Sequence, residues 1–78
     1  SAASDVYKTQ RQKVMIILGI ISLHGIQEML YWLVKVVQQN LLRMENINIF
    51  HIISYLEELK SLILKVLESL KGILIEIL

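Results

Sequence analysis

The chain has no cysteine and no proline, and only three of its 78 residues are glycine. Without cysteine it has no disulfide framework, no thiolate zinc site and no thiol nucleophile. Without proline, no residue is present that would break a long helix outright. Charge of one sign is also lacking, because eight basic and seven acidic residues leave a net charge of +1. This balance argues against a protein that binds nucleic acid by neutralising phosphates.

Apolar residues are abundant, at 55% of the chain, above the roughly 45–50% usual for soluble globular proteins. A domain of 78 residues hides only about 60% of the surface that its unfolded chain exposes. The chain therefore has more apolar side chains than one small monomer can cover. Self-association, a partner protein or a membrane surface would each cover the excess.

Two stretches carry residues at alternating steps of four and three, a spacing that places them on one face of an α-helix. They are termed the first seam and the second seam, and each is predicted to be buried against another helix. The same spacing extends to Met44 after the first seam and to Ile49 before the second. The first seam consists of Ile16, Ile20, Leu23, Gln27, Leu30, Val34, Val37 and Leu41. The second seam consists of Ile52, Leu56, Leu59, Ile63, Val66, Leu70, Ile73 and Ile77.

The first helix is expected over about 5–44, with residues 1–13 as a polar lead. Ser4 before Asp5 is a suitable N-cap followed by an acidic first turn. Gly25 leaves an alternative open, because glycine often ends a helix, and a break there would give a monomeric three-helix bundle. The first seam keeps its phase through Gly25, and one glycine inside a helix costs only about 1 kcal/mol. We therefore favour one long helix.

A turn is expected at about 45–48, where Asn46 and Asn48 favour a change of direction and Asn48 can cap the next helix. The second helix is expected over about 49–78. A strand over residues 14–18 is disfavoured, since no second strand is available to pair with it.

Folding back at this turn lays the two helices side by side over about 45 Å, at 1.5 Å per residue. The predicted fold is all-α, a long antiparallel hairpin in a single domain of residues 1–78. Residues 14–23 and 72–78 are apolar on nearly every side and meet at one end of the hairpin. A helix that is apolar all round must be buried all round, so we expect dimerisation into a four-helix bundle.

Candidate catalytic and metal-binding residues are few. His24 and Glu28 have a spacing that suits a metal ion when further ligands converge, but they fit a solvated stripe of the first helix more simply. Glu57 and Glu58 are adjacent, so they point about 100° apart and are unsuited to a shared acid–base role. We expect no metal, no cofactor and no enzymatic activity.

Membrane and nucleic-acid contacts receive limited support. The segment 7–13 combines three cations with a tyrosine, which suits an anionic surface, but we favour a solubilising polar segment. The longest apolar run, 14–23, is shorter than the roughly 20 residues needed to span a bilayer. We expect no transmembrane helix, no signal peptide and no nucleic-acid partner, and we favour the cytoplasm.

Four residues are candidates for contact with a partner. Gln27 is the only polar residue of the first seam; either it meets its copy across a dimer axis, fixing the register, or it reaches water at the seam edge. Tyr31, Trp32 and Tyr55 are candidate anchors of an interface, although Trp32 also suits the hairpin's own core.

The sequence thus predicts a non-enzymatic association module that acts through its apolar seams, with a second copy of the chain or another helical protein as the partner. A membrane-surface or membrane-active helical protein is the alternative. An engineered bundle without a biological role is a further alternative, suggested by the absence of cysteine and proline.

Overall fold

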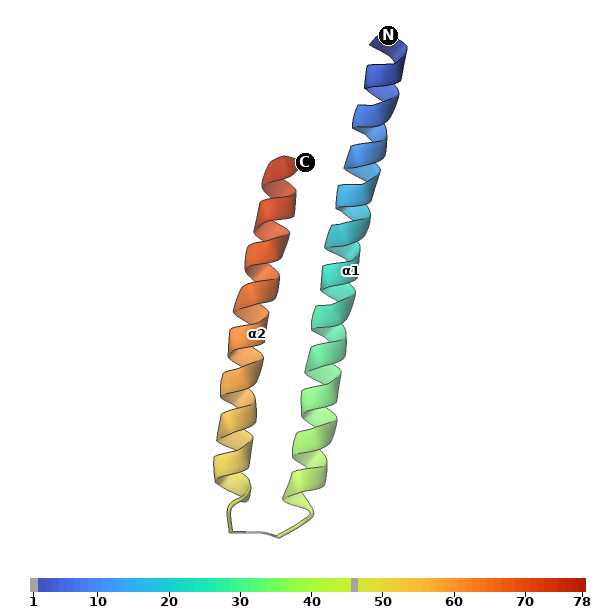
Figure 1. The fold of residues 1–78 in the computed structure, drawn as a ribbon. Coiled ribbons are helices and arrows are strands. Elements are labelled where there is room, and N and C mark those ends of the chain that lie inside the picture. Colours follow the sequence, from blue (N-terminus) through green and yellow to red (C-terminus); the bar gives the residue numbers. More distant parts are fainter. Residues whose placement is uncertain (1, 46) are drawn as a thin grey trace.

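The protein is an antiparallel pair of helices. The computed structural model describes residues 2–45 and 47–78, with side chains from residue 9 onward. Helix α1 (Ala2–Leu42) and helix α2 (Ile49–Ile77) lie side by side, and α1 extends past the end of α2 (Figure 1). The described residues contain no strand and span 68 × 17 × 9 Å. The predicted all-α hairpin is confirmed.

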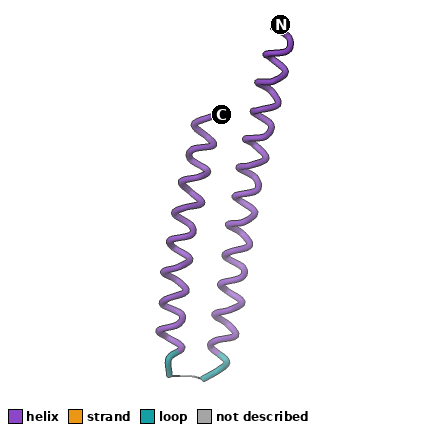
Figure 2. The backbone as a smooth tube through the Cα atoms, in the orientation of Figure 1, coloured by secondary structure: helices purple, strands orange, loops and turns teal. Residues whose placement is uncertain are grey.

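Helix α1 is continuous through Gly25, as the smooth backbone trace also shows (Figure 2). One long first helix is therefore confirmed, and the three-helix alternative with a break at Gly25 is wrong. The N-cap expected at Ser4 is also wrong, because the helix begins at Ala2 and includes Ser4. Ala2 and Ala3 are the best of helix formers, so the helix extends back through them.

The turn between the helices falls in the predicted place, although Asn46 lies outside the described residues. The last turn of α1 tightens, with Arg43 N donating to Asn40 O at 3.2 Å and Met44 N to Leu41 O at 3.0 Å. Glu45 then takes a left-handed conformation with φ of 49°, which ends the helix.

Asn48 occupies the N-cap position of α2, as predicted, but its side chain makes no capping hydrogen bond. Its backbone carbonyl accepts from Ile52 N at 3.1 Å, the first hydrogen bond of the helix.

The core between the helices is thin. Among the side chains that the structure describes, only Ile49 and Leu67 are buried, at 4% and 7% exposure. All eight residues of the first seam are half-buried in α1. The residues of α2 that are buried or half-buried, termed its contact face, are Ile49, Ile53, Leu56, Lys60, Leu64, Leu67, Lys71 and Leu74.

The second seam shares only Leu56 with this contact face. Its other seven residues are 37–62% exposed, so they flank the side of α2 that meets α1. Their burial in an assembly therefore stays a prediction.

Candidate association surface

One long side of the hairpin carries polar contacts between the helices and is termed the charged side. Gln38 Nε2 donates to Glu57 Oε1 at 2.5 Å, and Lys60 Nζ lies 2.8 Å from Glu57 Oε2. The same Nζ lies 6.0 Å from the ring centre of Tyr31. The hydrogen bond from Lys60, followed by that from Gln38, lowers the pKa of the Glu57 carboxyl. The hydrogen bond from Gln38 to Glu57 and the approach of Lys60 to Tyr31 connect the loop-proximal halves of α1 and α2, whereas the ion pair between Lys60 and Glu57 lies within α2.

A second polar contact lies within the seam itself. Lys71 Nζ donates to Gln27 Oε1 at 2.6 Å, and both residues are half-buried. The one polar residue of the first seam therefore has its partner on α2 of the same chain. A hydrogen bond from an ammonium is stronger than one between neutral groups, so this contact helps to fix the register of the hairpin.

The opposite side of the hairpin contains a shallow groove of about 350 Å³, lined by Gly19, Ser22, Leu23, Leu70, Ile73 and Leu74. The hydroxyl of Ser22 donates to Leu18 O at 2.8 Å, so it serves its own helix. A methyl group at Gly19 would lie 3.3 Å from Leu74 Cδ1. The missing side chain of Gly19 therefore both admits Leu74 and hollows this side.

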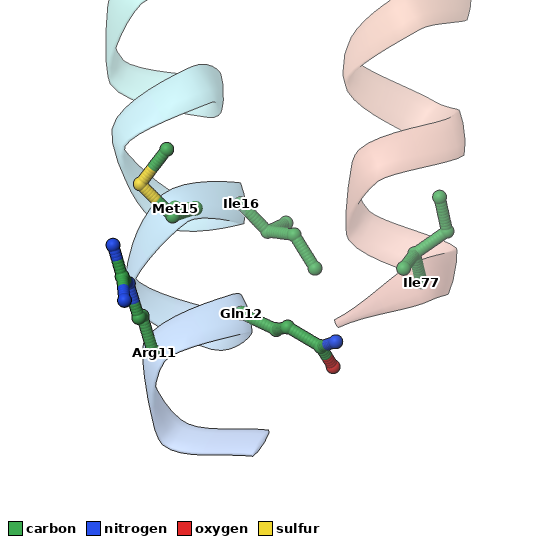
Figure 3. A pocket seen from close by; sticks show the side chains of 5 residues that line it. All are labelled: Arg11, Gln12, Met15, Ile16 and Ile77. Carbon is green, nitrogen blue, oxygen red and sulfur yellow. The ribbon is translucent and has the colours of Figure 1, made fainter. Parts of the chain in front are cut away.

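A larger groove of about 640 Å³ lies at the open end of the hairpin and is lined by Arg11, Gln12, Met15, Ile16 and Ile77. Figure 3 shows Gln12 and Ile16 extending from α1 toward Ile77 of α2, whereas Arg11 points away from α2. Both grooves include Ile73 or Ile77 of the second seam, so the second seam lies along their side of the hairpin.

Helical spacing extends this side along both helices. Residues two apart on a helix point about 200° apart. Leu33 therefore lies on the opposite side from Tyr31, and Leu59 on the opposite side from Glu57. Residues seven apart share a side, which joins Ile26 and Leu33 to Gly19. The resulting apolar side has nine members, each 37–62% exposed and none of them charged: Ile26, Leu33, Ile52, Leu59, Ile63, Val66, Leu70, Ile73 and Ile77.

The three aromatic candidates for partner contact are not brought together. Tyr31, 41% exposed, lies on the charged side against Lys60. Trp32, 67% exposed, is two residues from the half-buried Leu30 and Val34 and so lies about 200° around the helix from each. This places it on the side of α1 away from α2, where it does not cover the hairpin's own core. Tyr55, 62% exposed, is four residues before Leu59 and borders the apolar side.

The candidate metal pair remains a surface pair. His24 Nε2 lies 3.7 Å from Glu28 Oε1, with the two side chains 62% and 63% exposed. Within residues 2–45 and 47–78, no group of three or more His, Asp or Glu side chains gathers where it would hold a metal ion.

The first helix also has a membrane-compatible stretch. Among the described residues, the segment Thr9–Leu42 alone is long and apolar enough to cross a membrane, by length and composition only. This differs from the expectation based on residues 14–23, because the helix continues through His24 and Gly25 and its charges are sparse.

Comparison with known protein families, with curated proteins and with solved structures gives no match to this chain.

Proposed function

We propose that this chain is a non-enzymatic association module in which two copies pack through their apolar sides into a four-helix bundle. The observation that carries the proposal is the apolar side itself, a set of exposed uncharged residues that runs along both helices up to the open-end groove, where Arg11 is among the lining residues. A helix pair whose helices contact each other along one face and expose a second, apolar face matches half of a four-helix bundle.

The exposed area supports the same proposal. The chain exposes 6406 Å² at a mass of 9.0 kDa, whereas a compact protein of this mass exposes about 4,900 Å². Its radius of gyration is 19.1 Å, against about 11.5 Å for a compact domain of this length. The excess of about 1,500 Å² is larger than the roughly 800 Å² that each partner buries in a standard interface.

Molar mass by light scattering over a concentration series tests the proposal. We expect a mass of twice 9.0 kDa that falls toward the monomer on dilution. Val66→Glu places a charge on the apolar side and is expected to shift the equilibrium to the monomer. Ser61→Glu adds the same charge at an exposed position away from the apolar side and should leave the dimer intact.

Circular dichroism of each variant checks that it remains helical, and Ile26→Glu provides a second disruption from the other helix. A monomeric wild-type chain at every concentration would overturn the proposal. So would a dimer whose stability is the same in the Val66→Glu and Ser61→Glu variants.

A membrane-surface role is the second candidate, favoured by the apolar stretch within Thr9–Leu42. Such a helix would place its exposed apolar residues among lipid chains. Co-sedimentation with phosphatidylcholine–phosphatidylserine vesicles at physiological salt distinguishes the two candidates. The membrane role requires the chain in the pellet, whereas the bundle leaves it in the supernatant as a dimer.

A further inference from the structure

Contacts already described show which residues of α1 and α2 lie at the same height along the hairpin. Gly19 lies against Leu74, and Ile16 and Ile77 line one groove. Moving seven residues toward the turn on each helix places Ile26 level with Leu67 and its neighbour Val66. Ile26 and Val66 are both on the apolar side, 50% and 59% exposed, and they lie near the middle of the paired part of the hairpin.

Two copies of one chain are usually related by a twofold axis. The apolar sides face each other when this axis runs either across the hairpin or along it. An axis across the hairpin sets each helix antiparallel to its own copy, so the open end of one hairpin lies beside the turn of the other. An axis along the hairpin instead stacks α1 on α2 of the copy, with both open ends together.

The residues along the apolar side of α1 recur every seven positions as Gln12, Gly19, Ile26, Leu33 and Asn40. With a crossing axis at Ile26, that residue meets its own copy, Gly19 meets Leu33, and Gln12 meets Asn40. The half-buried Gly19 lines the groove of about 350 Å³, and Leu33 is 52% exposed. A hollow therefore receives a protruding side chain, and one side-chain amide meets another.

The same axis gives an equally matched pairing on α2. Val66 meets its own copy, and Leu59 meets Ile73, with the three residues 59%, 37% and 54% exposed. The axis along the hairpin would instead set Asn40 at the level of Ile52. It would thus bury the amide of Asn40 against an isoleucine without a partner, which costs free energy.

Charge favours the same orientation. The open end carries Arg11 and Lys13 and one carboxylate, Glu76, all exposed, and an axis along the hairpin would bring four such cations and two carboxylates to one end. The crossing axis separates them by most of the length of the hairpin, well beyond the Debye length of about 8 Å.

We infer that the two copies pack antiparallel through their apolar sides, about a twofold axis that passes Ile26 of α1 and Val66 of α2. This inference rests on the proposed function, since it specifies how the two copies are arranged.

The absence of cysteine permits a direct test by single-cysteine cross-linking. Ile26→Cys and Val66→Cys each place a thiol at the axis, where two copies come within the roughly 7 Å between Cα atoms that a disulfide requires. Each variant alone is expected to form a covalent dimer on oxidation. Lys65→Cys, one residue from Val66 and also exposed, is the matched control and is expected to remain uncross-linked.

The orientation and the association fail in distinguishable ways. A dimeric mass with cross-linking only when the Ile26→Cys and Val66→Cys chains are mixed would overturn the antiparallel arrangement and leave the proposed function standing. A dimer in which neither variant cross-links, alone or mixed, would also overturn this interface. A monomeric mass at every concentration would overturn both.

Discussion

Gly19 of α1 packs against Leu74 of α2, so closely that a methyl group at Gly19 would lie 3.3 Å from Leu74 Cδ1. Gly25, by contrast, has open space around it, with nothing within 4 Å of such a methyl group. Glycine inside a helix costs about 1 kcal/mol relative to alanine. We therefore expect Gly25→Ala to raise the free energy of unfolding by about 1 kcal/mol.

Gly19→Ala gains the same helix propensity but must displace the end of the Leu74 side chain by a few tenths of an ångström, so its gain is expected to be smaller. Denaturant unfolding at one fixed chain concentration measures both variants, with Gly72→Ala as a second open position. A gain for Gly19→Ala equal to that for Gly25→Ala would contradict the close packing.

The hydrogen bond between Lys71 and Gln27 is open to a double-mutant cycle. Gln27→Leu alone leaves the half-buried ammonium of Lys71 without the carbonyl that it contacts at 2.6 Å, so it is expected to stabilise little or to destabilise. Gln27→Leu with Lys71→Leu removes both polar groups and extends the apolar seam.

We expect the change in the free energy of unfolding of the double variant to exceed the sum of the changes of the two single variants by roughly 1 kcal/mol. If the changes of the two single variants add up to that of the double variant, this hydrogen bond contributes nothing to the stability of the hairpin.

The hairpin could be predicted from the sequence because the sequence features that bear on it agree. A continuous phase through Gly25 and the asparagines near the turn all indicate one arrangement of two helices. All eight residues of the first seam, predicted from spacing alone, are half-buried in α1, together with Gly19, Val36 and Gln38.

The face of α2 that meets α1 was harder to find, for a physical reason. Its contact face includes Lys60 and Lys71, and lysines are not part of an apolar pattern. Each of them nevertheless reaches a polar or aromatic group on α1. A second, wholly apolar stripe runs beside it and produces the more regular pattern. Spacing alone does not say which of two adjoining stripes an intramolecular partner covers.

The turn offers a local test of backbone strain. Glu45 adopts a φ of 49°, a left-handed conformation that costs a residue with a side chain about 1–2 kcal/mol. Glu45→Gly removes this cost but adds about 0.5–1 kcal/mol of conformational entropy to the unfolded chain. A net stabilisation of about 0.5–1 kcal/mol is expected by thermal or denaturant unfolding.

Met44→Gly is the control, because Met44 precedes the left-handed residue and does not share its positive φ. That variant is expected to destabilise. If the two glycine variants have the same effect, the left-handed position contributes no strain.

Acid should loosen the charged side of the hairpin through Glu57. Its pKa is lowered first by the hydrogen bond from Lys60 and then by that from Gln38, so the folded chain holds this carboxylate ionised to lower pH than the unfolded chain does. The resulting stabilisation is present above the unfolded value, roughly 4.3, and is lost as pH falls through the folded value. Because the side chain is exposed, 46%, the effect on stability is small at physiological salt.

The titration of the Glu57 carboxyl carbon by NMR measures the shift directly. Lys60→Met removes its largest cause and is expected to move the midpoint upward, while Gln38→Leu should produce a smaller upward move. Lys65→Met removes a cation eight residues further along α2 that makes no contact with Glu57 among those described, and it should leave the midpoint in place. An unchanged midpoint in Lys60→Met would mean that the ion pair between Lys60 and Glu57 does not persist in solution.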